Sequence, residues 1–370
     1  MRIAIVAPLV TAIREPQGGG SQAFVSDLAR GLAGRGHEVG VYAASGSQIP
    51  GVTVIDTGVD PESLRATLYR ADGPGARDQT PAELAFARVY ARVREAGWDV
   101  VHNHAFDAPA IALARGLDAP VVHTLHLPPD PAIADALRDA GSPGSSGSSG
   151  RPPAVAAVSQ FQAGEWRRVT RVDAVLPPLV PTRAIGWSSS PGHGAVFAGR
   201  LSPEKGAAEA IDIARAAGVA IEVYGDAYDA AYAREQIGPR RGRTGVTLHG
   251  GVARATLWAA MARAAVVLCP SRWDEPFGMA AAEAQACGTP VVAFRRGGLP
   301  EVIADGVTGF LVAPGDLEAA ADSLRKAAGL SRPACRRHAE RPLDLERSLD
   351  AHEQLYERAA GPRGGTAAGP

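Results

Sequence analysis

The sequence predicts an α/β protein with two doubly wound domains. The length of 370 residues fits two domains of ordinary size, at about 150 residues each. Each half opens with a short apolar run typical of a buried parallel strand, at residues 2–7 and 195–198. Each run leads through a turn that contains glycine into a stretch with helical spacing. Strand, glycine turn and helix in this order are typical of Rossmann-like sheets, which bind ligands at the ends of their strands.

The first turn and helix suit the binding of a diphosphate. The helix is predicted from about Ser21, and its apolar face is formed by Phe24, Val25, Leu28 and Leu32. Gly19 and Gly20 precede it, and because they lack side chains a diphosphate can approach their backbone amides. The alternative is a surface loop without a ligand.

The rest of the first half alternates between strands and helices. Further strands are predicted at residues 39–43, 52–56, 99–104, 121–126 and 154–159. Residues 81–96 and 161–168 have helical spacing, whereas residues 60–80 are polar and are expected to be irregular and to face a cleft. The run at 141–153, rich in Ser and Gly, is expected to be a mobile surface loop.

Polar side chains gather at two of these predicted strand ends. His102, Asn103 and His104 end one strand, and His126 ends the next. Doubly wound folds place ligand contacts at such positions, so these four residues are candidates for binding an acceptor or a sugar. The competing interpretation is that each histidine is a hydrogen-bonded core residue, and this alternative is strongest for His102.

The second half begins with a basic pair beside its first strand. Arg200 and Lys205 lie five residues apart, after the strand at 195–198 and before a predicted helix. Arg offers a planar fork of donors and Lys a compact charge, and together they can neutralise a diphosphate. The remaining elements are expected at 221–224, 247–252, 264–270, 287–294, 297–301 and 317–328.

The run from Ser271 to Glu283 contains the largest group of candidate binding residues. Glu275 precedes a Pro-Phe-Gly turn, and Glu283 lies about one helical turn beyond it. Pro276 is expected at the start of a helix, which leaves the amides of Phe277, Gly278 and Met279 free to bind an anion; those three amides are donor-binding candidates. A carboxylate accepts two hydrogen bonds, so each Glu suits a vicinal diol of a sugar or ribose.

Domain boundaries follow from the linkers. We expect an acceptor-binding domain at residues 1–180, a hinge at 175–181, and a domain that binds the nucleotide sugar at 181–342. A helix at 343–360 is predicted to pack back on the first domain, and the residues after Ala360 are expected to be disordered.

Composition excludes several classes of partner. Hydrophobic residues make up 46% and charged residues 21%, as in ordinary soluble proteins. A formal net charge of -1 gives no case for nucleic acid. Arg14 interrupts the first apolar run, and no run reaches the roughly 18 residues of a membrane span, so stable membrane insertion is not expected. We expect a cytoplasmic protein, and the oligomeric state stays open.

The three cysteines give no sign of a metal site. Cys269, Cys287 and Cys335 are far apart and odd in number, which suggests a reducing compartment rather than disulfides. Their apolar surroundings predict small buried side chains. We therefore expect neither a metal nor a cofactor.

Five sequence stretches, in order, resemble the retaining glycosyltransferases of family four, also called glycosyl transferase group 1, which have the GT-B architecture. They are "GGGSQAFVSDLARGLAGRGHEV", "DVVHNH", "FAGRLSPEKG", "DEPFGMAAAEAQACGTPVVA" and "GGLPEVIADGVTGFLVAPGD". The resemblance implies two Rossmann-like domains that face a central cleft. It implies catalytic roles for Glu275, His104, Arg200 and Lys205, and a nucleobase contact through the backbone near Val252.

The expected reaction is the transfer of a sugar, with retention, from a UDP- or GDP-sugar to a hydroxyl acceptor. Arg200 and Lys205 would stabilise the departing diphosphate without a metal, Glu275 would bind sugar hydroxyls, and Glu283 the ribose diol. The resemblance favours front-face attack. Two alternatives stay open: a nucleotide-sugar 2-epimerase of the same architecture, and a non-catalytic protein that binds sugar nucleotides.

Overall fold

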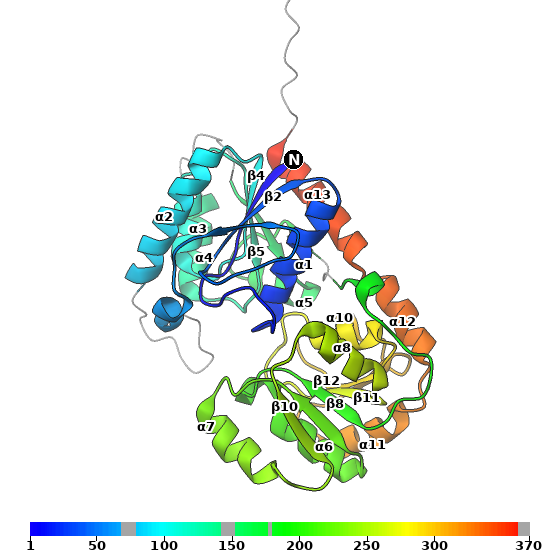
Figure 1. Ribbon diagram of the computed structural model, residues 1–370. Helices are drawn as coiled ribbons and strands as arrows, with labels where there is room; N and C mark the ends of the chain where they lie inside the picture. Colours follow the sequence, from blue (N-terminus) through cyan, green and yellow to red (C-terminus); the bar gives the residue numbers. More distant parts are fainter. Residues whose placement is uncertain (68–78, 142–151, 177–179, 362–370) are drawn as a thin grey trace, which may run out of the picture.

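The computed structural model describes residues 1–67, 79–141, 152–176 and 180–361. These residues form two lobes, each built on a parallel sheet that is flanked by helices (Figure 1). The sheet of the N-terminal lobe has seven strands among the described residues, and that of the C-terminal lobe has six. The predicted α/β fold with two doubly wound sheets is therefore confirmed. The predictions for the 141–153 loop, the 175–181 hinge and the chain after Ala360 lie largely outside the described residues.

The N-terminal sheet has the order β3-β2-β1-β4-β5-β6-β7. Its strands are β1 (Arg2–Val6), β2 (Glu38–Ala43), β3 (Thr53–Asp56), β4 (Val100–Asn103), β5 (Val121–Leu125), β6 (Ala154–Ala157) and β7 (Ala174–Val175). Its helices are α1 (Gly20–Gly34), the 3-10 helix η1 (Pro61–Thr67), α2 (Thr80–Ala96), α3 (Ala108–Ala114), α4 (Pro131–Gly141) and α5 (Gln160–Trp166).

Both faces of this sheet are covered, which explains why its strands read as continuous apolar runs. Ile3 and Ile5 of β1 pack in one core with α1, whereas Ala4 and Val6 point to the opposite face and pack in a second core with α2. All four side chains are fully buried. In Figure 1, α1 lies on one side of the sheet and α2 with α3 on the other.

The C-terminal sheet repeats the same winding, with the order β10-β9-β8-β11-β12-β13. Its strands are β8 (Ala195–Ala198), β9 (Ile221–Tyr224), β10 (Val246–Gly250), β11 (Val266–Cys269), β12 (Val291–Phe294) and β13 (Gly309–Val312). Its main helices are α6 (Ala207–Ala217), α7 (Ala230–Tyr232), α8 (Arg254–Arg263), α9 (Met279–Ala286), α10 (Leu299–Val302), α11 (Leu317–Ala327) and α12 (Arg332–Glu340). Short helical turns are η2 (Thr182–Ala184), η3 (Pro203–Lys205), η4 (Ala233–Ile237) and η5 (Gly238–Arg240).

The strand order reverses at one point in each sheet, between β1 and β4 and between β8 and β11. Chain connections leave in opposite directions at such a point, so a crevice opens beyond the carboxyl ends of the two strands. The loops that follow β1, β4, β8 and β11 therefore form the places where a ligand is expected. Every candidate catalytic residue lies in one of these four loops or at its edge.

The C-terminal helix α13 (Leu345–Ala360) crosses to the N-terminal lobe, where it contacts α1, β4 and β5. Arg35 at the end of α1 donates to the carboxylates of Glu346 and Glu353, at 2.7 and 2.6 Å. His352 and Tyr356 of α13 are fully buried under the sheet. The helix thus places two polar side chains beside the strand ends of β4 and β5.

One helix begins later than the sequence predicts. Pro276 was expected to open the helix that carries Glu283, but α9 begins at Met279 and the residues before it form a loop. The reason is Gly278, whose φ of 106° is left-handed and prevents the helix from extending backwards. The backbone of Glu275 instead accepts a hydrogen bond from Gly298 N at 2.7 Å.

Candidate active site

Lys205 and Glu275 meet at the centre of the C-terminal lobe's strand ends. The Lys205 ammonium lies 2.7 Å from Oε1 of Glu275, and the Ser271 hydroxyl donates to the same oxygen at 2.7 Å. Burial acts to raise the pKa of Glu275, but the Lys205 charge and these hydrogen bonds outweigh it, so the pKa is lowered. The site therefore holds an ionised carboxylate next to an ammonium group.

Two glycines allow the loops of this pair to come together. Gly206 follows Lys205 with a φ of 75°, and a Cβ there would lie 2.1 Å from the carbonyl oxygen of Pro270. Gly297 has a φ of 56°, and a Cβ there would lie 2.2 Å from the carbonyl oxygen of Glu275. No other residue fits at either position without moving the backbone. The glycines thus fix Lys205 and Glu275 side by side.

Arg200 lies on the same wall, and it is held by a carboxylate and a ring. Its Nη2 donates to Glu204 Oε1 at 3.3 Å, and its guanidinium carbon lies 4.3 Å from the centre of the Tyr228 ring. Lys205 has a similar partner, because its ammonium lies 4.9 Å from the centre of the Trp273 ring. The predicted basic pair is thus oriented before any ligand binds.

The start of α9 faces the glycine turn of the other lobe. A Cβ on Gly20 would lie 3.5 Å from Met279 Cγ, so α1 and α9 begin next to each other. The amides of Phe277, Gly278 and Met279 donate to no described residue. Gly19 and Gly20 leave the neighbouring backbone uncovered by side chains. An anion between the two helix starts would find donors from both lobes.

Glu283 is buried within an ion-paired cluster that crosses between the lobes. Arg254, the first residue of α8, donates to Glu283 Oε1 from Nε at 3.1 Å and from Nη2 at 2.6 Å. The same guanidinium donates to both carboxylate oxygens of Asp27 on α1, at 2.9 and 2.8 Å. The sequence interpretation left Glu283 unpartnered, and it missed both Arg254 and Asp27.

The predicted nucleobase turn lies at the end of β10. Gly251 N donates to the carboxylate of Asp226 at 2.7 Å, which fixes the turn. Val252 follows it, half-buried, and its backbone N–H and C=O bond to no described residue. These backbone groups are therefore available to a ligand.

Two of the predicted strand-end residues, His102 and Asn103, have structural partners. His102 is fully buried, and its two ring nitrogens bond to Tyr356 Oη and Thr124 Oγ1, each at 2.7 Å. The side chain of Asn103 bonds to His123 and to the Ala105 amide. These bonds leave no ring nitrogen of His102 for an acceptor, because its position on the strand turns it into the core.

His104 and His126 form a different arrangement at the same edge. His104 Nδ1 lies 2.9 Å from His126 Nε2, which makes them a hydrogen-bonded pair, while His104 Nε2 is buried and has no partner among the described residues. The ring of Phe24 on α1 contacts both imidazoles, with centroids 5.5 and 5.2 Å away. His104 therefore carries one ring nitrogen that the protein does not use.

Burial keeps this cluster neutral. It lowers the pKa of His126 to about 3 and the pKa of His352 to about 4. Burial also places the pKa of His104 well below its ordinary value, and the neighbouring imidazoles lower it further. At neutral pH these rings can exchange hydrogen bonds but contribute no charge.

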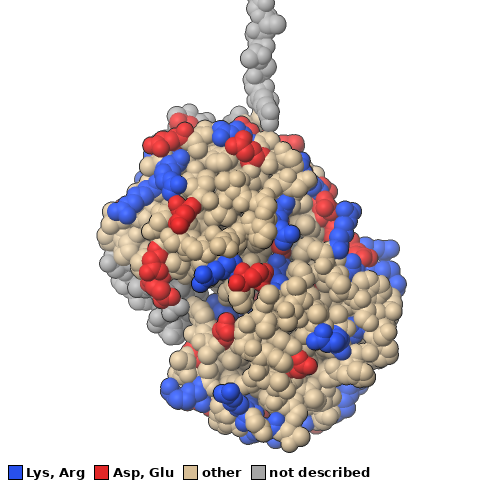
Figure 2. Space-filling view, viewed as in Figure 1, with Lys and Arg blue, Asp and Glu red and all other residues tan. Residues whose placement is uncertain are grey.

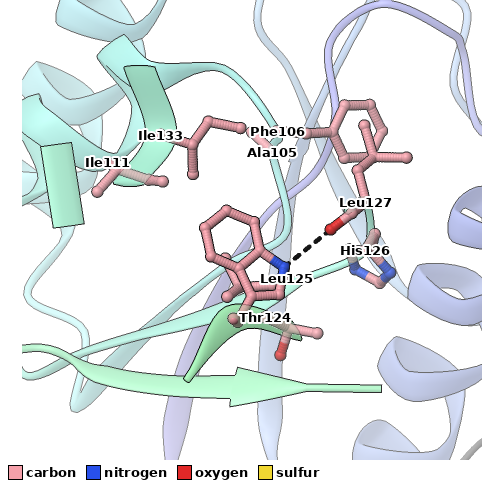
Figure 3. Close-up of a pocket in the computed structure, with 9 residues that line it drawn as sticks. Ala105, Phe106, Ile111, Thr124, Leu125, His126, Leu127 and Ile133 are labelled. Atoms are coloured by element: carbon pink, nitrogen blue, oxygen red, sulfur yellow. Dashed lines mark hydrogen bonds between the residues drawn. The ribbon is translucent and has the colours of Figure 1, made fainter. Parts of the chain in front are cut away.

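A small apolar pocket lies behind His126 (Figure 3). Its volume is about 10 Å³, which is room for about one water molecule. Trp166 is one of the residues that line it, and its Nε1 donates to the carbonyl of Leu127 at 2.9 Å. The pocket is too small for a sugar. Figure 2 shows a hollow between the lobes, with basic and acidic side chains on its rim.

The described residues offer neither a metal site nor a membrane-spanning helix. No group of three or more His, Cys, Asp or Glu side chains is placed to hold a metal ion. Nor does any described helix combine the length and the apolar character that crossing a bilayer requires.

Comparisons with known proteins identify the family. The profile described as Glycosyltransferase Family 4 matches residues 18–183, and the profile described as Glycosyl transferases group 1 matches residues 193–340. A D-inositol 3-phosphate glycosyltransferase of Acidothermus cellulolyticus is 30% identical over 360 residues, which cover 84% of this chain and 79% of the relative. The chain belongs to the family 4 glycosyltransferases. The protein is therefore a glycosyltransferase.

Other relatives agree with this assignment. The D-inositol 3-phosphate glycosyltransferase of Mycobacterium tuberculosis is 30% identical over 422 residues, covering 97% of this chain and 84% of the relative. Among solved structures, a sucrose-phosphate synthase from Thermosynechococcus elongatus has a TM-score of 0.78 at 18% identity, covering 97% of this chain and 99% of that one. HepE from Anabaena, solved with UDP-glucose, has a TM-score of 0.71 at 22% identity, covering 96% and 99%. These structures establish the GT-B fold.

The candidate site contains residues that the sequence did not predict. Ser271 and Trp273 flank Glu275 within the same motif, where they could have been recognised as its nearest polar neighbours. Asp27 gave a clearer signal, because it is an acidic residue within the apolar helix α1 and is only 4% exposed. Arg254 gave none, since a basic residue at the start of a helix is usually solvated.

Proposed function

We propose that this glycosyltransferase moves a sugar, with retention of configuration, from a UDP- or GDP-sugar to a hydroxyl acceptor without a metal. The observation that carries the proposal is the contact of Lys205 with Glu275 at 2.7 Å, beside the helix start at Met279. A diphosphate needs cations and amide donors, and a sugar needs carboxylate acceptors. Both kinds of group are present within one site.

In the proposed reaction, the bond between the sugar C1 and the diphosphate oxygen breaks while the acceptor oxygen bonds to C1 from the same face. The proton of the acceptor hydroxyl goes to an oxygen of the departing diphosphate. Lys205 and Arg200 stabilise the charge that develops on this leaving group. Glu275 binds sugar hydroxyls, and its existing bonds to Lys205 and Ser271 orient it rather than prepare it as a nucleophile. Front-face attack therefore fits this carboxylate better than double displacement.

The N-terminal lobe supplies uncharged contacts to the reacting sugar. The unused Nε2 of His104 is the group proposed to bond a sugar or acceptor hydroxyl, and His126 holds the ring through Nδ1. Asn103 and His102 support the strand end rather than the acceptor. The relatives are named for D-inositol 3-phosphate, so this phosphorylated polyol is the first acceptor to test.

The test is a transfer assay with a panel of nucleotide sugars and acceptors. Thermal shifts first identify the donor, because a ligand that binds only the folded state raises the apparent stability. Proton NMR of the product then reports the anomeric configuration, for which retention is expected. The assay is repeated after treatment with a chelator, and no loss is expected. An inverted product would overturn the retaining assignment.

Incubation with donor alone separates transfer from the competing enzyme class. An epimerised nucleotide sugar formed without an acceptor would indicate a 2-epimerase. Binding of donor without turnover of any acceptor, at full saturation, would indicate a non-catalytic protein. Slow hydrolysis of the donor is compatible with transfer, because water can replace the acceptor.

A further inference from the structure

The guanidinium of Arg254 joins carboxylates from the two lobes. It bonds Asp27 of the N-terminal lobe through Nη1 and Nη2, and Glu283 of the C-terminal lobe through Nε and Nη2. All three residues are at most 9% exposed. The orientation of Glu283 is therefore linked, through one side chain, to a residue on the opposite side of the cleft.

Arg254 bonds one of the two carboxylate oxygens of Glu283. Both bonds from Arg254 end on Oε1, and Oε2 accepts from no described residue. A carboxylate oxygen has two lone pairs, so Oε2 can accept hydrogen bonds from a ligand while Oε1 stays occupied. Arg254 thus fixes the carboxylate plane without covering the oxygen that a diol would use.

Arg254 is itself positioned mainly from the N-terminal lobe. Besides the two bonds to Asp27, its backbone N–H donates to Glu15 Oε2 at 3.0 Å. The Trp258 ring lies 4.8 Å from its guanidinium carbon and supports it from its own helix. If the lobes move apart, Arg254 loses both N-terminal contacts while it keeps Glu283.

We propose that Arg254 is a positioning residue, held by Asp27, that orients Glu283 for the donor ribose only when the two lobes meet. This inference rests on the proposed function, because it takes Glu283 as the group that binds the ribose diol. It adds that a residue of the N-terminal lobe, without touching the donor, sets donor affinity. Binding of the nucleotide and closure of the lobes are then coupled, since each makes the other more favourable.

The energetics of these buried charges favour a role for Arg254 in positioning Glu283 over a role in stabilising the fold. A buried ion pair contributes little net stability, because the desolvation of its charges offsets their attraction. Burial raises the pKa of Asp27, and the Arg254 charge opposes only part of that effect. The arrangement is thus a poor source of stability but a rigid geometric constraint, with four charge-assisted hydrogen bonds on one planar group.

The test measures whether Asp27 and the ribose diol are coupled. Calorimetric titration of the full-length protein compares UDP and GDP with their 2′,3′-dideoxy forms, using whichever base binds better. In the wild type, loss of the diol should weaken binding about tenfold, as expected for a charge-assisted bond. Asp27→Leu should weaken binding of the ribonucleotide about tenfold and leave the dideoxy form unchanged. Equal weakening of both forms would overturn the positioning role.

Control variants separate this role from unfolding and from loss of lobe contact. If circular dichroism shows that Asp27→Leu does not fold, Asp27→Asn takes its place, because the amide keeps the shape of the side chain. Asp27→Asn should give a smaller effect of the same pattern. Glu15→Gln removes a cross-lobe carboxylate that, within the described parts of the chain, bonds the Arg254 backbone and not its guanidinium. This variant should not change the discrimination between ribo and dideoxy forms. A loss of discrimination in Glu15→Gln equal to that in Asp27→Leu would contradict the assignment to the Arg254 side chain.

The outcome also distinguishes this inference from the proposed function. If neither nucleoside diphosphate binds the wild type, the nucleotide-sugar donor is wrong and the positioning role falls with it. If the wild type binds and discriminates the diol, but Asp27→Leu and Asp27→Asn discriminate equally well, only the positioning role is overturned.

Discussion

The N-terminal and C-terminal lobes each form one wall of the cleft, and the two walls carry different kinds of candidate side chain. On the C-terminal wall every candidate cation has a carboxylate partner: Lys205 has Glu275, Arg200 has Glu204, and Arg254 has Glu283. On the N-terminal wall the candidates are imidazoles that bond to each other or to hydroxyl groups. Burial lowers the pKa of those imidazoles, whereas the pKa of Glu275 is lowered by the neighbouring Lys205.

This difference assigns separate tasks to the lobes. A departing diphosphate carries the charge of the reaction, and only fixed cations and amides can stabilise it. A sugar or acceptor hydroxyl is uncharged, and a neutral imidazole can bond it without attracting the phosphate. The cations beside the candidate diphosphate site thus lie on the C-terminal wall, and the N-terminal groups proposed to bond hydroxyls are neutral imidazoles; the carboxylate of Asp27 on the N-terminal lobe is paired with Arg254. The predictions below test this separation.

Acid should unfold the protein through the N-terminal wall. The pKa of His123 and of His352 is lowered to about 4, and that of His126 to about 3, while the unfolded chain titrates near 6.5. Between these values the unfolded state binds three more protons at these three histidines, so the stability they contribute is present above about pH 6.5 and is lost as pH falls. Between pH 6.5 and pH 5 these three residues alone should lower the free energy of unfolding by about 5 kcal/mol, and His102 and His104, whose pKa values are also lowered, act in the same direction. Urea titrations at several pH values measure this slope.

A matched variant checks the origin of that slope. His123→Asn keeps a polar side chain beside Asn103 but removes one buried imidazole, so the slope should decrease by about one proton. A slope that does not change in this variant would show that the acid sensitivity comes from other groups.

Lys205→Met should lower kcat by about 10³, because it removes a preorganised charge from the leaving group, where single donors contribute about 10²–10³. The effect should be on kcat more than on KM if the charge acts mainly in the transition state. Lysine is rare in this chain, where it occurs only at positions 205 and 326. Lys326→Met is therefore a matched control, and this exposed residue at the end of α11 should have no effect. Similar losses in both variants would contradict the assignment.

His104→Ala should lower kcat/KM for transfer by about tenfold to a hundredfold, as expected for one hydrogen bond to a substrate. Its effect should not depend on pH between 7 and 9, because burial keeps the imidazole neutral in that range. His104→Gln should restore part of the activity, since an amide can also donate to a hydroxyl. A loss of activity that follows a titration near pH 7 would instead show that this ring carries a proton.

The sequence predicted the fold and the charged wall better than the neutral wall. Strand runs and glycine turns are local patterns, so the two sheets and the loops that carry Lys205 and Glu275 could be expected from neighbouring residues. Their ion pair was not predicted, because it joins residues 70 positions apart. The Asp27 to Arg254 contact joins residues 227 positions apart, so no local pattern predicts it, although Asp27 stands out as an acidic residue within an apolar helix. His102 and His104 look alike in sequence, but Tyr356 from the last helix and Thr124 from β5 occupy both ring nitrogens of His102. The helix start at Met279 was missed because the left-handed conformation of Gly278 is not visible in the sequence; a Cβ at this position would also lie 2.7 Å from Leu299, which is distant in the chain.

The smallest expected effect concerns how aromatic rings are used on the two walls. On the N-terminal wall Phe24 packs against imidazoles, whereas Tyr228 is 55% exposed and lies over Arg200 at 4.3 Å. A cation–π contact at an exposed site contributes about 0.5–1 kcal/mol. Tyr228→Leu should therefore raise the KM for the donor about threefold and leave kcat unchanged, because Arg200 keeps its charge but loses part of its orientation. Tyr228→Phe retains the ring and should behave like the wild type. If Tyr228→Leu and Tyr228→Phe raise the KM equally, the effect comes from the hydroxyl. The two walls would then not differ in their use of aromatic rings at this position.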